Sequence, residues 1–290
     1  MKRILSCAAS DFAETPARSE LVEAIRASEG RVIMAQATAE DACVLGGVSN
    51  AELIASFGTD LVLIKVLDVE HPRIVNVGEG PEVVARAKRL TGRLVGVNLE
   101  VIGANGLSYD GPTILSERTI GAACSLRPDY LNLTAYRNKP GNDTEAVTDA
   151  VRLARAHFDG MIVLNKYASA AELCSENGWE GYLEAGADVL TLPAPGTVPG
   201  AHVAMLAPIA ERIHAAGGLV SMSFATSQEG CDADTMRRLA IAAKEAGADL
   251  YDFGDANANG IADPENILTL SIAVRGKRHT YFRTAASINR

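Results

Sequence analysis

Short runs of aliphatic residues alternate with longer amphipathic stretches along nearly the whole chain. The runs are rich in Val, Ile and Leu, which is typical of parallel strands that are covered on both faces. The stretches between them repeat their apolar residues with helical spacing. The aliphatic runs predict strands over residues 31–36, 61–67, 94–101, 130–134, 161–165, 189–193, 219–224 and 250–254.

The amphipathic stretches predict a helix between consecutive strands, one after the last strand and one before the first, over residues 16–28. Several helices are expected to end on a glycine in the left-handed conformation, with an aspartate turning the chain into the next strand, as in Gly247-Ala248-Asp249. The remaining helices are predicted over residues 50–57, 81–90, 116–126, 144–158, 170–184, 203–216, 233–246 and 267–274.

This alternation predicts a parallel α/β sheet, and the number of units favours closure into a single (β/α)8 TIM barrel with an N-terminal helix before strand one. The rival is an open doubly wound sheet, but no G-x-G-x-x-G motif follows the first strand. We expect one domain over residues 1–290, with a small hairpin in the insertion 102–115. The basic tail 275–290 is expected to end in solvent, or to pack on the barrel or a neighbouring subunit.

Composition supports this fold and narrows the possible partners. Hydrophobic residues make up 48% of the 290 residues and aromatic residues only 5%, so the core is expected to be aliphatic. The formal net charge of −9 argues against nucleic acid as a partner, although a local pocket can still be positive. Five scattered cysteines, no signal-peptide pattern and no apolar span favour a cytoplasmic protein that does not bind membranes.

Polar residues gather at the C-terminal ends of the predicted strands, where TIM barrels carry their active sites. They recur with a period of two, so one face of each strand end is polar and is expected to point into the barrel. Polar side chains that converge on one mouth indicate a ligand site. The residues expected to bind substrate are Gln36, Asn98, Asn132, Tyr136, Asn165, Ser223, Thr226, Ser227, Gly254 and Asn257.

Two lysines and two acids at the mouth are candidates for catalysis. Lys65 lies in the apolar run 61–67 and needs a buried partner, for which Glu100 on the next strand is expected. Either Lys65 or Lys166 could stabilise an anion or form a Schiff base, and Glu100 or Asp252 could transfer a proton. We therefore expect all four residues to have catalytic roles.

Carboxylates and amides at the mouth also suit Mg²⁺, a hard cation that prefers oxygen ligands. Asp255 and Glu100 are the expected metal ligands. The loops 225–230 and 254–260, after the last two strands, are expected to bind phosphate through backbone N–H groups. The predicted ligand is therefore a small anionic metabolite, with Mg²⁺ as the cofactor.

Three stretches occur together in the sequence: SEGRVI at 28–33, GDA…GIA…PENI at 254–267 and RGKRHTY at 275–281. Together they resemble a bacterial TIM-barrel family labelled phosphoenolpyruvate phosphonomutase, similar to isocitrate lyases, over nearly the whole chain. The resemblance implies the barrel, a pocket for an acidic substrate, Mg²⁺, and a homo-oligomer in which the last helix packs on a neighbour. At the third strand, however, this chain has Asn98-Leu99-Glu100 instead of Asp-x-Asp, and it lacks the K-K-C-G-H loop of the lyases. No catalytic residue is therefore carried over by motif.

Three functions are consistent with the sequence. The first is a phosphonomutase-like lyase or isomerase that acts on a small phosphorylated or carboxylated metabolite through an enolate. The second is an aldolase that uses Lys166 or Lys65 as a Schiff base. The third is a non-catalytic barrel that binds a metabolite and regulates a partner.

Overall fold

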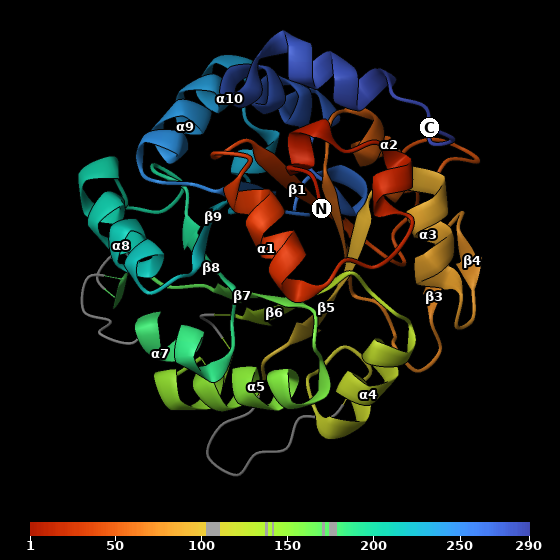
Figure 1. Ribbon diagram of the computed structural model, residues 1–290, viewed down its shortest axis with the longest axis horizontal. Helices are drawn as coiled ribbons and strands as arrows, with labels where there is room; N and C mark the ends of the chain where they lie inside the picture. The colour runs from red at the N-terminus through yellow and green to blue at the C-terminus, as the bar shows by residue number, and fades with distance from the viewer. Residues whose placement is uncertain (103–110, 137–138, 141, 170–171, 174–178) are drawn as a thin grey trace.

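Eight parallel strands close into a barrel, in the order β1-β2-β5-β6-β7-β8-β9-β10, which confirms the predicted (β/α)8 fold (Figure 1). The computed structural model describes residues 1–102, 111–136, 139–140, 142–169, 172–173 and 179–290. The predicted hairpin at 102–115 lies largely outside these residues. The barrel strands are β1 (Val32–Thr38), β2 (Leu61–Lys65), β5 (Leu94–Glu100), β6 (Tyr130–Ala135), β7 (Met161–Lys166), β8 (Val189–Pro193), β9 (Leu219–Phe224) and β10 (Leu250–Phe253).

Helices surround the barrel close to their predicted places, except that about half of the helix predicted over 170–184 lies outside the described residues. Short 3-10 turns and a small hairpin, β3 (Arg73–Ile74) with β4 (Gly78–Glu79), add to them. None of the helices in the described ranges combines the length and hydrophobicity that a bilayer span requires. The helices are α1 (Arg18–Arg26), α2 (Asn50–Ser56), α3 (Val83–Thr91), α4 (Glu117–Ser125), α5 (Thr144–His157), α7 (Trp179–Ala185), α8 (Val203–Ala215), α9 (Ala233–Glu245) and α10 (Pro264–Ala285), and the 3-10 turns are η1 (Ile4–Ser6), η2 (Ala9–Phe12), η3 (Gln228–Gly230) and η4 (Ala258–Gly260).

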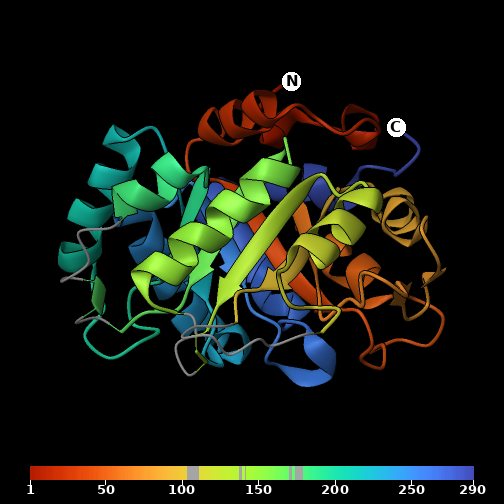
Figure 2. The ribbon, with the colours of Figure 1, turned by 90° about the horizontal axis from the view of Figure 1, so that it is seen from below.

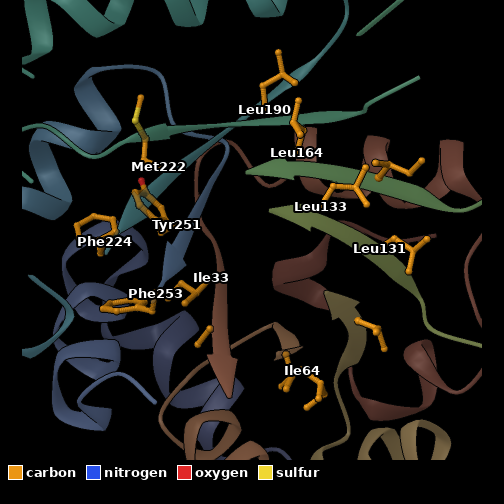
Figure 3. Packing of buried hydrophobic residues seen from close by; sticks show 14 of the residues in the cluster. Ile33, Ile64, Leu131, Leu133, Leu164, Leu190, Met222, Phe224, Tyr251 and Phe253 are labelled. Carbon is orange, nitrogen blue, oxygen red and sulfur yellow. The ribbon is translucent and has the colours of Figure 1, made fainter. Parts of the chain in front are cut away.

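The faces of the strands divide as the period-two pattern predicts. The outward face is aliphatic and aromatic and packs against the helices in one large cluster, part of which Figure 3 shows. On β9 and β10 the rings of Phe224 and Phe253 stack with centroids 5.5 Å apart. Because this face is apolar, the polar residues of the same strands lie on the inward face.

The lower half of the barrel interior is apolar and is closed by the N-terminal segment. Ile4, Phe12, Leu21 and Ile25 are buried in one cluster with the first inward residues of the strands. Figure 2 shows this segment, with α1, lying across one end of the barrel. The opposite end, where the strands finish, is therefore the open mouth.

The ring of Tyr130 fills the interior beside Gly96 on the neighbouring strand. A Cβ at Gly96 would lie 2.3 Å from the ring of Tyr130, which is fully buried. Glycine at position 96 is thus required by a close approach between two inward-facing positions.

Replacing Gly96 with alanine is expected to lower the free energy of unfolding by about 1–3 kcal/mol, because the added methyl group overpacks a site that cannot relax. Urea unfolding measures the change. Gly121→Ala is the matched control, since nothing lies within 4 Å of its Cβ position in α4 and it is expected to be neutral or stabilising. A double change of Gly96→Ala with Tyr130→Leu should recover stability, and no recovery would contradict the steric explanation.

An aspartate immediately precedes every second barrel strand. Each carboxylate accepts a hydrogen bond, 2.8–2.9 Å long, from the backbone N–H of the second residue of the preceding barrel strand. The backbone N–H of the aspartate donates to the carbonyl of that same residue. These pairs are Asp60 with Ile33, Asp129 with Val95, Asp188 with Ile162 and Asp249 with Val220.

Asp60 also holds the C-terminal helix in place. Arg275 and Arg283 of α10 each approach the carboxylate to 2.7 Å, and the three side chains are almost completely buried. Arg283 also donates to the carbonyls of Ile4 and Cys7, which links α10 to the N-terminal segment. Of the alternatives expected for the basic tail, packing on the barrel is the one that the structure shows, because residues 275–285 are helical and two of their arginines are buried against Asp60.

Candidate active site at the mouth of the barrel

The carboxyl group of Asp252 lies inside the barrel near the mouth and is completely buried. The side-chain amide of Gln36 on β1 donates to both carboxylate oxygens, at 2.8 and 2.9 Å. Asn165 on β7 donates a longer hydrogen bond of 3.4 Å. Burial raises the pKa of Asp252 to about 7, while the Gln36 amide and the nearby Lys65 ammonium oppose that rise. Asp252 can therefore hold or release a proton near neutral pH.

Lys65 ends β2 and brings a buried positive charge to the same region. Its Nζ donates to the hydroxyl of Tyr136 at 3.0 Å and lies 3.2 Å from the carboxylate of Asp255. Burial lowers the pKa of Lys65, but Asp255 and the neighbouring tyrosines raise it more, so it lies above its ordinary value. Lys65 is therefore a permanent cation near neutral pH. The strand stops here because Val66 is left-handed, with φ of 54°.

The predicted pair of Lys65 with Glu100 is wrong. Glu100 instead lies 3.4 Å from the Nζ of Lys139. Lys65 reaches Asp255 because the loop after β10 passes over the mouth close to β2. Tyr136 lies between Lys65 and Lys139, since the Nζ of each lysine is 5.5 Å from the centroid of its ring.

Amide and hydroxyl side chains line the β5–β6 side of the interior. Asn132 donates to Asn98 Oδ1 at 2.7 Å, and the Thr134 hydroxyl donates to the same oxygen at 2.6 Å. The ring of Tyr136 stacks on Tyr167 at 5.6 Å. These contacts fix the wall opposite β10, so the predicted inward positions on β5 and β6 do converge on the mouth.

A recess opens at the ends of β7, β8 and β9, beside Asp252. Its cavity volume is about 30 Å³, room for a water molecule or one small polar group, and its lining includes Asn165, Thr191 and Ser223. Thr191 and Ser223 are 2% and 4% exposed, and within the described part of the chain their hydroxyls have no hydrogen-bond partner. Buried polar groups are normally paired, so these hydroxyls are free to bind a ligand or water.

Glu229 is a buried carboxylate that the sequence analysis missed. It comes from η3, after β9, and is 0% exposed. The backbone N–H of Ala256 donates to its Oε1 at 3.0 Å. Burial raises its pKa, whereas the backbone N–H groups of Glu229, Ala256 and Ser227 favour the ionised form. The signal was weak because Glu229 lies in a polar loop of ordinary composition.

The Glu229 carboxylate lies against the loops 225–230 and 254–260, which were expected to bind phosphate through their backbone N–H groups. N–H groups that were expected to face an anionic ligand instead face this carboxylate. Gly254 makes room for it, since a Cβ there would lie 2.9 Å from Glu229 Oε1. Thr226 and Ser227 are exposed and left-handed, and the Thr226 hydroxyl donates to the carbonyl of Thr197 at 2.7 Å.

Two further predicted residues lie away from the barrel interior. Lys166 lines the recess and is buried, but strand alternation places it on the outward face together with Leu164. Asn257 is exposed on the loop after β10. The structure thus brings Gln36, Lys65, Asn165 and Asp252 together, and leaves these two at the rim.

The expected Mg²⁺ ligands do not fit a metal site. Asp255 forms an ion pair with Lys65, and Glu100 forms one with Lys139. Among the residues that the structure describes, no three His, Cys, Asp or Glu side chains are arranged to hold a metal ion. We therefore derive no step that uses a metal.

The closed barrel and its polar, charged mouth define a TIM barrel with a candidate ligand site at the C-terminal ends of its strands. The chain belongs to the family described as Domain of unknown function (DUF7916), whose match covers residues 5–290. No curated protein matches the chain.

Solved structures with the same fold are enzymes of different classes. The carboxyl transferase domain of Rhizobium etli pyruvate carboxylase, with pyruvate, has a TM-score of 0.53 and 13% identity, and the match covers 96% of this chain and 52% of that one. A proposed alpha-galactosidase/melibiase from Bacteroides fragilis has a TM-score of 0.50 and 11% identity, with 88% and 61% covered. The chain spans less than two thirds of either structure. At these identities the similarity shows the fold alone.

Proposed function

We propose that this barrel is an enzyme that acts on a small carboxylated or phosphorylated metabolite through an enolate, as lyases and isomerases of the phosphonomutase type do. The observation that carries the proposal is that Asp252, whose pKa is about 7, lies close enough to the buried ammonium of Lys65 for that charge to lower its pKa, while Lys65 itself forms its ion pair with Asp255. A carboxylate that titrates near neutral pH suits proton transfer. A buried cation suits stabilisation of the oxyanion that forms.

In the proposed reaction the Asp252 carboxylate accepts a proton from the carbon next to the substrate's carbonyl group. The electron pair of the broken C–H bond forms the C=C bond of the enolate, and the π pair of the C=O bond moves to the oxygen, which becomes the enolate oxygen near Lys65. Gln36 and Asn165 hold the Asp252 carboxyl group in position. Protonated Asp252 can then return the proton to carbon.

The Schiff-base alternative is less well supported. A Schiff-base lysine attacks as the neutral amine, but Asp255 keeps Lys65 protonated. Lys166 lies on the outward face of β7. A non-catalytic barrel is also less well supported. A buried carboxylate is energetically unfavourable in its ionised form, and carboxylates with a raised pKa cluster at catalytic sites.

Solvent exchange tests the proposal directly. In deuterated buffer, the protein is expected to exchange the C3 protons of a 2-oxo acid faster than buffer alone. Pyruvate, 2-oxobutanoate, oxaloacetate and 4-hydroxy-2-oxobutanoate form a suitable panel, followed by proton NMR. Lys65→Met should slow the exchange by about 100-fold or more, since it removes the cation that faces the developing charge.

Two results would contradict the proposal: no exchange above buffer with any of these acids, or full exchange by Lys65→Met. Borohydride treatment with each acid separates the aldolase alternative, because only a Schiff base leaves a covalently modified lysine. Arg212→Ala, which removes an exposed ion pair with Glu180 far from the mouth, is a surface control that should exchange normally.

A further inference from the structure

The recess beside Asp252 has the chemistry of a binding site for hydroxyl groups. Thr191 on β8 and Ser223 on β9 line it with buried hydroxyls that have no partner among the described residues. Ser221, next to Thr191 in the sheet register, carries a third such hydroxyl. A buried hydroxyl without a partner is unfavourable by itself, so the two hydroxyls that line the recess indicate that a polar ligand group binds here, whereas Ser221 is not part of the lining.

The recess directly adjoins the proposed reaction centre. Ser223 is the register neighbour of Asp252, and Asn165 both lines the recess and donates to the Asp252 carboxylate. A substrate whose reacting carbon lies at Asp252 would therefore extend its next atoms into the recess.

The walls limit what can enter. Pro193, Val198 and Ala225 give the recess an apolar side. The Thr226 hydroxyl is bonded to the carbonyl of Thr197, which ties the β9 loop to the β8 loop. The recess is thus a small bounded pocket, and it suits a single carbon that carries a hydroxyl group.

A phosphate group is disfavoured in this position. The Glu229 carboxylate accepts hydrogen bonds from backbone N–H groups of the loops after β9 and β10. It lies close behind Ala225, since a Cβ at Gly254 would be 2.9 Å from Glu229 Oε1 and 3.3 Å from Ala225 Cα. The chain therefore supplies its own anion to these backbone donors, and its negative charge counters the attraction that Lys166, which also lines the recess, would exert on a phosphate.

We infer that this recess binds the neutral, hydroxylated end of the substrate, and that the substrate class is a hydroxylated 2-oxo acid rather than a phosphorylated one. The inference rests on the proposed function, which places the oxo-acid end at Asp252 and Lys65. The hydroxyls of Thr191 and Ser223, which line the recess, exchange hydrogen bonds with the substrate's hydroxyl group. Their ability both to donate and to accept suits such a neutral partner.

Isothermal titration with three probes tests this inference without requiring turnover. The probes are 4-hydroxy-2-oxobutanoate, 2-oxobutanoate, which lacks only the hydroxyl, and 3-phosphonopyruvate, which carries a phosphonate. The hydroxylated acid is expected to bind at least about tenfold more tightly than either of the others. Equal or weaker binding of the hydroxylated acid, or no binding of any probe, would overturn the inference.

Two conservative variants locate the effect. Thr191→Val and Ser223→Ala should each weaken binding of the hydroxylated acid by about five- to tenfold and leave 2-oxobutanoate unchanged, because a hydrogen bond is lost without a change in shape. Thr91→Val is the matched control, since it removes a buried threonine hydroxyl of α3 that bonds to Ala87. Unchanged selectivity in both recess variants would contradict the assignment.

The titrations and the exchange assay fail independently. If the hydroxylated acid binds selectively through Thr191 and Ser223 but no acid exchanges its protons, the recess is a binding site and the enolate proposal is wrong. If exchange proceeds without preference for the hydroxylated acid, and binding is equally unselective, the enolate proposal stands and the recess assignment is wrong.

Discussion

Asp252→Asn is expected to lower the rate of C3 proton exchange by about 100- to 10,000-fold, the range typical of losing a general base. Asparagine preserves the size of the side chain and can still pair with Gln36, but it cannot accept the proton. Initial exchange rates measured by proton NMR at saturating 2-oxo acid give the comparison. The folded state should persist, as checked by circular dichroism, because no buried charge loses its partner.

The pH dependence provides a sharper test of the same group. Asp252 must be ionised to act as the base, so the exchange rate should rise with pH and level off above about 7. The Gln36 amide lowers this pKa, so Gln36→Leu should move the profile to higher pH while leaving a measurable plateau. If Gln36→Leu has the same pH–rate profile as the unmodified protein, or if Asp252→Asn still shows the rise near pH 7, another group is responsible for the titration.

The same shift affects stability, and its sign follows from the direction of the pKa change. Burial raises the pKa of Asp252 in the folded chain above that of an unfolded aspartate, so the folded state binds this proton more tightly. The resulting stabilisation is fully present below the unfolded pKa of about 3.9. It is lost as the pH rises towards about 7. The carboxylate thus carries an energetic cost at the pH at which it would act as a base.

Asp60→Asn is expected to reduce the free energy of unfolding by about 3–5 kcal/mol, the usual cost of leaving a buried charge without its partner. Arg275 and Arg283 would both remain buried without the carboxylate that they share. Urea denaturation at pH 7 measures the change through the midpoint and slope of the transition.

Asp249→Asn is the matched control for this prediction. Asp249 holds a strand N–H in the same way as Asp60, but its ionic partner is His214, a half-exposed side chain 2.8 Å away. The control should therefore cost much less. Equal losses in the two variants would show that the stabilisation comes from the backbone hydrogen bond and not from the buried arginines.

The fold could be predicted from sequence because its signals are local. Continuous aliphatic runs, period-two alternation at their ends and glycine-aspartate turns are each complete within a few residues. The ends of elements were less certain, as at Val66, where a left-handed residue stops β2 before its aliphatic run ends. For segment 275–290 the sequence left solvent and packing on the barrel open, because Asp60, the partner that buries two of its arginines, lies far away in the sequence.

The site was predictable only in part. The inward positions Gln36, Asn165 and Asp252 follow from strand parity, and the structure brings them together. The pairing of Lys65 with Asp255 could not be foreseen, because it depends on the path of a loop. Glu229 was missed for the same reason, since nothing in a polar loop marks which carboxylate will turn inward.

The contact between an aspartate and a strand N–H occurs once for each pair of consecutive barrel strands. A contact with this period divides the barrel into four segments of two strands each. Such regularity is what duplication and fusion of a short ancestral segment would leave behind. In that history the bottom of the barrel preserved the inherited contact, while the copies diverged at the mouth, where Lys65 occurs on the first segment and Glu229 and Asp252 both occur on the fourth.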